Sequence, residues 1–428
     1  MTVPTPDPQR ARWPHIVVGA GMSGLAAAWY AARSGRETLV LEAAPVPGGC
    51  MHSHRFPELE DYWVEAGSHS CFNSYGNLLL ILEELGLLAR ATAKAKLPYR
   101  LWREGRRRSA LSALHPLELL CALPRLPGRK KAGATVREYY GAVLGQRNYR
   151  DLLGPAFRSI ICQPADAVPA ETLFRKKPRR KDVLRDFTFP NGLGEVPAAL
   201  AAAPDLTVET GRAATACHAR DGHFEVVCED GSRHEAAAVT LALPPDRTAA
   251  LLASVAPAAA AVAGQITMAE IDSQLLVFER DDLSIEPIAG LISIDGAFLS
   301  AVSRDFLEHP RWRGFAFHFP GGAVDETARI AAGCTALAAD PGRLRATAAV
   351  HHRLPALRRG HGDRIAALDR AIAAAPGGER LGVTGNWFLG VSLEDCVSRS
   401  RAEHERRFGA IVPSPRTPAA PVIDRTTG

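Results

Sequence analysis

The sequence predicts a mixed α/β fold with more than one domain, from its length and from two changes of pattern along the chain. A chain of 428 residues is longer than one hydrophobic core usually accommodates. The β-rich run 15–18 is followed by a glycine-rich turn, by an Ala-rich helix ending near Gly35, and by a second strand over 37–43. Beyond residue 187 short strands alternate, and Asp230-Gly231 is typical of a hairpin turn. We therefore expect a βαβ unit first and an α+β region later.

Gly19, Gly21 and Gly24 form a GxGxxG pattern between the first strand and the first helix. In a Rossmann-like unit these glycines permit the tight turn, the approach of a pyrophosphate and the close packing of helix on strand, in that order. The N–H groups at the helix start, around Met22 and Ser23, present the positive end of the helix dipole to the same phosphates. This context predicts a dinucleotide site and disfavours a plain glycine-rich turn.

The residues after the second strand extend the dinucleotide prediction. Glu42 ends that strand, where a carboxylate accepts ribose hydroxyl groups, and Ala43 follows it. Gly48 and Gly49 then provide a second place where the backbone can approach the cofactor closely.

Strand-rich and helical stretches follow one another in an order that predicts a chain visiting its domains more than once. The nucleotide domain is then assembled from separated pieces. The boundaries that we expect are 14–90, 190–262 and 376–412 for a discontinuous dinucleotide-binding domain, 263–375 with parts of 75–100 for an α+β substrate domain, 100–185 for a helical insert, and 1–13 and 413–428 for disordered termini.

Composition disfavours several classes of function. The net charge is +5, only 7 of the 51 basic residues are Lys, and the basic residues cluster at 103–108, 128–131 and 175–181. No nucleic-acid-binding motif accompanies them, and we expect no nucleic acid partner. The 8 cysteines are scattered without a CxxC pair, which disfavours disulfides and a metal site and favours the reducing cytoplasm.

Two stretches bear on membranes. Residues 248–269 are uncharged but contain Pro257, Gly264 and Gln265, which makes a spanning helix unfavourable. The Leu-rich stretch 110–127 lies between two basic clusters. It is compatible with peripheral contact at the inner face of a membrane or with a helical cap whose charged faces are solvated.

The order of these signals resembles the glutathione-reductase-like FAD proteins, and among them the flavin amine oxidase superfamily. Glu65 and Gly67, in "WVEAGSHS", end another expected strand in the same order. A second GxGxxG is missing, because "GLGEVP" (192–197) lacks the last glycine and a preceding strand. The resemblance implies FAD as the cofactor, no separate nicotinamide domain, and oxygen or another compound as the electron acceptor.

Five later segments resemble protoporphyrinogen oxidases and their coproporphyrinogen-oxidising relatives, and they occur in the same order. They are "LLGPAFRSIICQPADAVPAETLF" (152–174), "FPNGLGEVPAALA" (189–201), "VTLALPP" (239–245), "LPALRRGHGDRIAALDRAI" (354–372) and the closing flavin motif "GNWFLGVSLEDCV" (385–397).

The same resemblance implies which residues lie at the flavin. They are Gly385, Asn386, Gly390, Val391 and Ser392 along the isoalloxazine, with Ala214 at the adenine, where Val is usual. The helix that starts near Leu393 is expected to direct its N–H groups at the N1–C2=O edge, where the reduced flavin gathers negative charge.

On the substrate side, the resemblance places Arg100 beside a propionate group, which a guanidinium binds through two hydrogen bonds. Phe157, Trp387 and Phe388 are candidates to line an apolar cavity for a flat macrocycle. A solvated surface Arg and plain core aromatics are the alternatives. We assign no catalytic side chain and no metal, because the flavin performs the chemistry.

These features predict an FAD-dependent oxidase that removes hydrides from a porphyrinogen-type tetrapyrrole and reduces oxygen to hydrogen peroxide. The alternatives are a flavin-dependent desaturase or amine-oxidase-like enzyme acting on another hydrophobic substrate, and a degenerate flavoprotein that only binds. Val46 and Cys50 motivate the last of these, because the family usually has Arg around the Gly-Gly doublet. Residues 300–322 also depart from the family pattern. The sequence leaves the oligomeric state open, a homodimer included.

Overall fold

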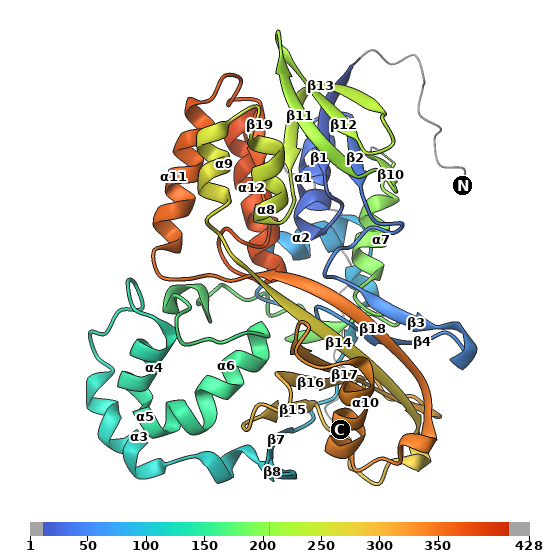
Figure 1. The fold of residues 1–428 in the computed structure, drawn as a ribbon, viewed down its shortest axis with the longest axis vertical. Helices are drawn as coiled ribbons and strands as arrows, with labels where there is room; N and C mark the ends of the chain where they lie inside the picture. The colour runs from blue at the N-terminus through green and yellow to red at the C-terminus, as the bar shows by residue number, and fades with distance from the viewer. Residues whose placement is uncertain (1–11, 205, 411–428) are drawn as a thin grey trace.

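The computed structural model describes residues 12–204 and 206–410, and Figure 1 shows them as two lobes. Most of the expected disordered termini, residues 1–11 and 413–428, lie outside the described residues, as do residues 411–412. Trp13 departs from that expectation, because it is 8% exposed and begins the first strand. The structured part of the chain therefore starts before residue 14.

The upper lobe is built on a 7-stranded sheet whose strands come from distant parts of the chain (Figure 1). In spatial order the strands are β10 (Leu206–Thr210), β2 (Thr38–Glu42), β1 (Trp13–Val18), β13 (Arg233–Leu241), β12 (His223–Cys228) and β11 (Ala214–Arg220), with β19 (Leu381–Val383) also paired to β13. The central strands run parallel, whereas β11, β12 and β13 form an antiparallel meander. Parallel pairing aligns the carboxyl ends of β1, β2, β13 and β19 at one edge.

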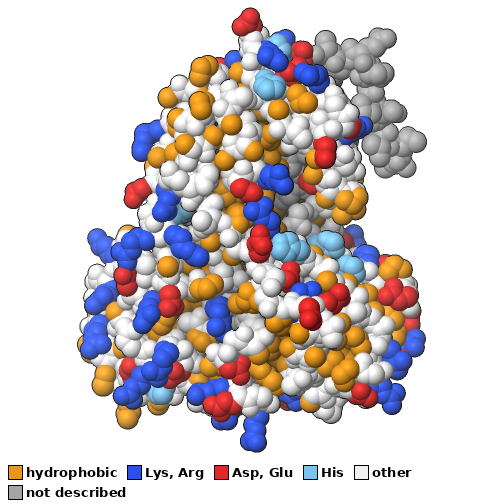
Figure 2. Space-filling model, in the orientation of Figure 1, with side chains coloured by type: hydrophobic (Ala, Val, Ile, Leu, Met, Phe, Trp, Pro, Cys, Tyr) orange, Lys and Arg blue, Asp and Glu red, His pale blue; other side chains and the backbone are white. Residues whose placement is uncertain are grey.

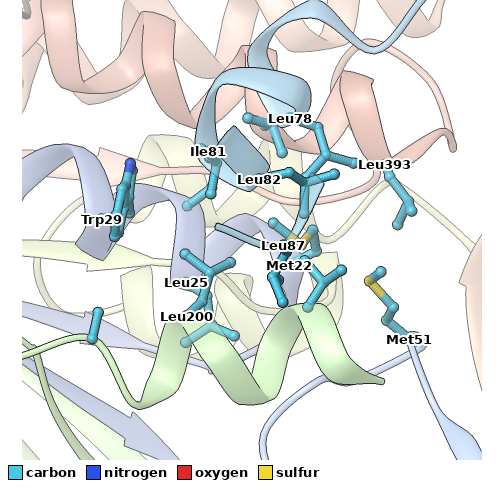
Figure 3. Close-up of a cluster of buried hydrophobic side chains, with 14 of the residues drawn as sticks. Met22, Leu25, Trp29, Met51, Leu78, Ile81, Leu82, Leu87, Leu200 and Leu393 are labelled. Carbon is cyan, nitrogen blue, oxygen red and sulfur yellow. The ribbon is translucent and has the colours of Figure 1, made fainter. Parts of the chain in front are cut away.

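Helices cover both faces of this sheet, and the alternation along β1 shows why both faces are apolar. Val17 packs into one core cluster, whereas Ile16 and Val18 pack into the other. One face is covered by α1 (Met22–Arg33), α2 (Gly76–Glu84), α7 (Glu195–Ala201) and α12 (Leu393–Phe408), and the other by α8 (Pro245–Leu252), α9 (Pro257–Ala263) and α11 (His361–Ala374). Figure 3 shows the first cluster, where Leu25, Leu82 and Leu393 converge from three of these helices.

The lower lobe contains a second 7-stranded sheet. Its strands, in spatial order, are β18 (Leu344–Pro355), β14 (Met268–Glu279), β17 (Trp312–Pro320), β16 (Ser300–Ser303), β15 (Gly290–Ser293), β7 (Tyr99–Arg103) and β8 (Arg106–Ser109). Phe315 and Phe317 of β17 pack under α10 (Glu326–Leu337), whereas Ala316 packs against Val64 on β4 (Tyr62–Glu65). Because both faces are covered, β17 is buried along almost its whole length.

Two smaller sheets connect the lobes. Strand β4 pairs with β3 (Ser53–Phe56), and β9 (Asp186–Thr188) pairs with β5 (Cys71–Phe72) and β6 (Thr92–Ala93). The segment after β4 therefore lies between the first sheet and the second.

The helical insert forms its own small core beside the second sheet. Its helices are α3 (Pro116–Ala122), α4 (Val136–Leu144), α5 (Gln146–Asn148) and α6 (Gly154–Ile161), with a π-helical turn at Tyr149–Leu153. Thr135 and Glu138 form a reciprocal capping box that starts α4. Tyr149 and Ile161 are buried in the core of the insert.

Two expected boundaries are wrong. Residues 100–109 lie on β7 and β8 of the second sheet instead of in the helical insert, because β7 pairs with β15. Helix α11 belongs to the core of the upper lobe instead of the substrate domain, since Ile365, Leu368 and Ile372 pack there with α9. Within the described residues, no helix combines the length and the apolar character that crossing a membrane requires.

Candidate functional site

The carboxyl ends of the parallel strands β1, β2, β13 and β19 meet at one edge of the upper sheet. We call this edge, with the residues that directly follow these strands, the cradle. The N–H of Gly19, after β1, donates to the carbonyl of Leu41 on β2 at 2.8 Å. The N–H of Thr384, after β19, donates to the carbonyl of Leu241 on β13 at 3.0 Å. In doubly wound sheets this edge is where ligands bind.

The three motif glycines of this cradle differ in what surrounds them. A Cβ on Gly24 would lie 1.8 Å from the carbonyl oxygen of Gly19, and Gly19 itself has φ +101° and Ala242 O within 2.6 Å of its would-be Cβ. A Cβ on Gly21 would meet no atom within 4 Å. Gly19 and Gly24 are therefore required by packing, whereas Gly21 faces open space at the start of α1.

Helix α1 begins at this open space without a side-chain cap. Gly21 is its N-cap residue, the first turn has no acidic residue, and Met22 and Ser23 begin the helix. The N-terminal N–H groups and the positive end of the dipole are thus available to an anion. This arrangement fits a pyrophosphate.

The second glycine pair lies against the first motif, as its spacing suggested. The N–H of Gly48 donates to Ala20 O at 2.9 Å, and a Cβ on Gly49 would lie 3.3 Å from the Cα of Gly21. Both glycines have positive φ, +130° and +56°. Val46, where the family usually has Arg, is exposed on this loop.

Glu42 lies at the rim of the cradle, and its carboxylate already holds the loops around it. Oε2 accepts the Ala20 N–H at 2.6 Å and Oε1 accepts the Ala44 N–H at 2.8 Å, which leaves further lone pairs for ribose hydroxyl groups. The neighbouring residue Ala43 is exposed. Ala214 begins β11, next to the turn in which the Arg212 N–H donates to Glu42 O at 2.7 Å. The predicted ribose and adenine positions therefore lie at one rim.

Glu65 differs from its expected role at the cofactor, because its carboxylate binds protein groups. It is 2% exposed, accepts the Leu193 N–H at 2.7 Å and accepts the hydroxyl of Ser53 at 2.8 Å. Burial raises its pKa to about 7, against the opposing effect of these hydrogen bonds. Gly67 is required by packing, since its Cβ would lie 1.9 Å from Cys50 O.

The closing segment starts a helix at Leu393, as the sequence indicated, but the helix end is capped. Ser392 Oγ accepts the Asp395 N–H at 3.2 Å, and Asp395 Oδ2 accepts the Ser392 N–H at 3.3 Å. Arg175 and Lys177 bind the same carboxylate, and Lys177 Nζ lies 2.8 Å from Oδ1. The N-terminal end of α12 therefore has two cations, Arg175 and Lys177, beside the positive end of its helix dipole.

Gly385 and Gly390 of that segment leave room for side chains of the protein itself. A Cβ on Gly385 would lie 2.4 Å from Trp387 Nε1, and one on Gly390 would lie 2.5 Å from Asp395 Oδ2. Asn386 and Val391 are partly exposed, and Val391 packs against the core of the insert.

Trp387 and Phe388 are not positioned to line a substrate cavity. They are 0% and 4% exposed and belong to the core beneath α8, α9 and α11. Trp387 Nε1 donates to Leu243 O at 3.0 Å, and Trp387 O lies 2.6 Å from His361 Nε2. Trp387 and Phe388 therefore stabilise this core, because the chain turns into it immediately after Gly385.

The other two expected substrate residues also have protein partners. Arg100 lies on β7 and forms an ion pair with Glu286, so its guanidinium already binds a carboxylate of the chain. Phe157 is 6% exposed and packs against Tyr140 and Phe174 in the insert. The structure does not bring Arg100, Phe157 and Trp387 together.

Histidines that the sequence did not single out gather between the cradle and the second sheet. His69 and His318 have ring centroids 5.5 Å apart, and His352 Nε2 donates to Ala66 O at 3.0 Å. The carbonyl of His52 accepts the Ala66 N–H at 2.9 Å. These histidines are far apart in the chain. Only the position of His69, two residues after Gly67, could have indicated a functional residue from the sequence. Among the described residues, no group of three or more His, Cys, Asp or Glu is arranged to hold a metal ion.

Residues 22–160 match the family model of flavin containing amine oxidoreductases. Over this part of its length the chain is similar to the flavin amine oxidase superfamily. The cofactor is FAD, and the open space at Gly21 with the uncapped start of α1 fits its pyrophosphate.

Solved structures are similar over nearly the whole chain. A protein from Exiguobacterium sp., provisionally named a protoporphyrinogen oxidase, superposes with a TM-score of 0.74 at 18% identity, covering 92% of this chain and 98% of that one. Reduced UDP-galactopyranose mutase gives 0.70 at 14% identity, with 92% and 95% covered. Putrescine oxidase bound to putrescine gives 0.64 at 14% identity, with 91% and 98% covered. At these identities the likeness shows the fold.

Sequence relatives match over short stretches. The 15-cis-phytoene desaturase of Narcissus pseudonarcissus is 36% identical over 72 residues, which are 17% of this chain and 12% of the desaturase. The L-amino-acid oxidase of Daboia russelii is 52% identical over 40 residues, 9% of this chain and 8% of that protein. The chain therefore matches only a small part of the length of these relatives.

Proposed function

We propose that the protein is an oxidase that removes hydrides from a porphyrinogen-type tetrapyrrole and delivers the electrons to oxygen, giving hydrogen peroxide. The observation that supports this proposal most is the likeness to the Exiguobacterium protein, which extends over 92% of the chain and so includes the second sheet and the insert. The order of the segments 152–174, 189–201, 239–245 and 354–372 supports the same substrate class.

The residues of the cradle have separate parts in this proposal. Gly21, Met22 and Ser23 would hold the pyrophosphate at the start of α1, and Glu42 would bind the ribose. FAD, when bound, supplies the hydride acceptor. The chain must then place a C–H bond of the substrate at the flavin and accept the proton that accompanies the hydride.

The second candidate is a desaturase acting on another hydrophobic substrate. The local identity to the phytoene desaturases favours it. An amine substrate has less support, because amine oxidases need a Lys near the flavin. Lys94, beside the histidine group, already donates to His69 O at 3.0 Å and to Ser70 Oγ at 2.6 Å.

The test is anaerobic mixing of the FAD-loaded protein with protoporphyrinogen IX, coproporphyrinogen III, phytoene in detergent and putrescine, while the flavin absorbance is followed. We expect bleaching with a porphyrinogen and, after admission of oxygen, hydrogen peroxide and the fluorescence of the porphyrin. Bleaching by phytoene alone would establish the desaturase instead, and bleaching by neither porphyrinogen would overturn the first proposal.

We also propose peripheral contact of the insert with the inner face of a membrane. Leu111, Leu117 and Leu120 are 77%, 78% and 62% exposed, and the last two lie on α3. Figure 2 shows Lys and Arg side chains concentrated over the lower left of the molecule, where Figure 1 places the insert. Exposed leucines among basic residues are typical of binding to anionic lipid surfaces.

A further inference from the structure

Two imidazole rings meet where the lobes join. His69 lies in the segment after β4, His318 lies on β17, and their ring centroids are 5.5 Å apart. One ring therefore comes from the cofactor side and the other from the second sheet.

Each ring has a buried nitrogen without a hydrogen-bond partner in the described part of the chain: Nδ1 of His69 and Nε2 of His318. Buried polar atoms are normally paired, because an unpaired one loses its hydration without replacement. His318 is 3% exposed, so water does not solvate its ring freely. Two such atoms on facing rings call for a functional explanation.

Neighbouring groups hold both rings in place. Ser273 Oγ and His318 Nδ1 are 2.8 Å apart, so when Nδ1 carries the proton it donates to the hydroxyl, and Nε2 presents a lone pair. Lys94 Nζ donates to the carbonyl oxygen of His69 at 3.0 Å, which fixes the backbone that carries the other ring.

Both rings are neutral near physiological pH. Burial, and then the charge of His352, lowers the pKa of His318 to about 4. Burial, and then the charges of His318, Lys94 and His352, lowers the pKa of His69 well below its usual range. The titratable and charged groups around the pair are Lys94 after β6, His352 on β18 and, facing Lys94, Glu65 on β4 and Asp186 on β9. Two neutral imidazoles are able to accept a proton.

Backbone hydrogen bonds place the pair beside the cofactor loop. The Ser68 N–H donates to Cys50 O at 3.1 Å, and the Ala66 N–H donates to His52 O at 2.9 Å. Residues 50–52 directly follow the Gly48-Gly49 turn that lies against Gly21. A substrate that lies between the cradle and the second sheet would therefore lie near both rings.

We propose that His318 and His69 are the proton acceptors of the oxidation, an inference that rests on the proposed function. The oxidation would remove a hydride from a carbon of the substrate, which FAD would accept when bound, and a proton from an N–H bond conjugated with that carbon. The proton moves to Nε2 of His318, with Nδ1 of His69 as the neighbouring acceptor, and the electron pair of the N–H bond forms a C=N bond. The hydride and this proton together reduce one oxygen molecule to hydrogen peroxide.

This assignment also narrows the substrate class. A porphyrinogen has pyrrole N–H groups conjugated with the carbon that loses hydride, so a base next to the hydride acceptor has a proton to receive. A hydrocarbon such as phytoene has no N–H group. The histidine pair therefore favours a porphyrinogen over the desaturase substrate.

The first test measures the rate of flavin bleaching at saturating porphyrinogen as a function of pH. We expect His318→Gln and His69→Gln to slow bleaching on the order of 10²-fold, the usual contribution of a general base. We also expect loss of the fall in rate on the acidic side. The double variant should be no slower than the slower single variant, because the two rings serve one proton transfer. The matched control is His351→Gln, an exposed residue of β18 that contacts Asp272.

The second test does not depend on turnover or on the variants folding well. Nitrogen NMR of the FAD-loaded protein with labelled histidine reports the protonation of each ring, and Ser273→Ala, a milder change, identifies the His318 signals through their shift. We expect His318 Nε2 to be unprotonated near pH 6.5, the ordinary pKa of histidine. A protonated Nε2 there would overturn the assignment.

Failure of this inference and failure of the proposed function give different results. Rates of both single variants within about twofold of wild type, with an unchanged pH profile, would overturn the proton-acceptor role and leave the porphyrinogen substrate standing. Absence of bleaching by any porphyrinogen in the wild type would overturn the proposed function, whereas the NMR result would still report the state of His318.

Discussion

Glu65 and Leu193 are joined by a hydrogen bond of 2.7 Å from the Leu193 N–H to the buried carboxylate, which ties the end of β4 to the turn before α7. Burial raises the pKa of this carboxyl to about 7, so the proton is retained in the folded protein to a higher pH than in the unfolded chain. The unfolded state then binds fewer protons, and stability falls as pH rises between about 4.5 and about 7.

We predict that Glu65→Gln removes this part of the pH dependence. The amide oxygen can still accept the Leu193 N–H, and the variant should gain on the order of 3 kcal/mol relative to wild type as pH rises through that window. Urea unfolding of both proteins across the window measures the difference. Glu58→Gln, at an exposed position, is the control; equal pH slopes for wild type and Glu65→Gln would contradict the prediction.

Gly21 and Gly24 should respond differently to the same substitution. Gly21→Ala places a methyl group in open space with φ −71°, so we expect normal folding and FAD affinity weaker by roughly tenfold or more. Gly24→Ala would push a methyl group against Gly19 O and destabilise the protein by roughly 2 kcal/mol or more. FAD titration and thermal unfolding of the apo-protein separate the two effects. Gly76→Ala, also in open space at the start of a helix, should bind FAD normally.

The buried ion pair between Arg313 and Asp305 should be the most sensitive charge pair of the second sheet. Its atoms Nη2 and Oδ2 are 2.6 Å apart and the side chains are 7% and 4% exposed, so Asp305→Asn leaves a buried guanidinium without its counter-charge. We predict a loss of about 3–5 kcal/mol in the free energy of unfolding. The exposed pair of Arg280 and Glu308 is the control, and Glu308→Gln should change stability by about 0.5 kcal/mol or less.

Vesicle binding tests the membrane proposal. We predict that the protein sediments with anionic phospholipid vesicles at low salt and that Leu117→Asp with Leu120→Asp reduces the bound fraction at least severalfold, because both leucines are exposed on α3. Val324→Asp changes an exposed apolar residue away from the insert and should bind as wild type does. Equal binding of wild type and the α3 variant would show that this surface does not contact lipid.

Local patterns were sufficient for the first βαβ unit and for the start of α12. The glycine spacing predicted the turn after β1 and the start of α1, and Ser392 before Leu393 marks the start of α12, because capping and tight turns depend on residues close in sequence. Patterns could not say that Glu65 would turn inward to Leu193, since that contact depends on how two distant segments pack.

The sequence by itself determined the βαβ unit and the glycine turn from Gly19 to Gly24. Tertiary structure decided that Trp387 belongs to the core and that His69 faces His318. The physical reason is the range of the interactions. A glycine turn or a helix start is specified within a few residues, whereas burial and the meeting of two rings follow from the packing of sheets whose strands come from opposite ends of the chain.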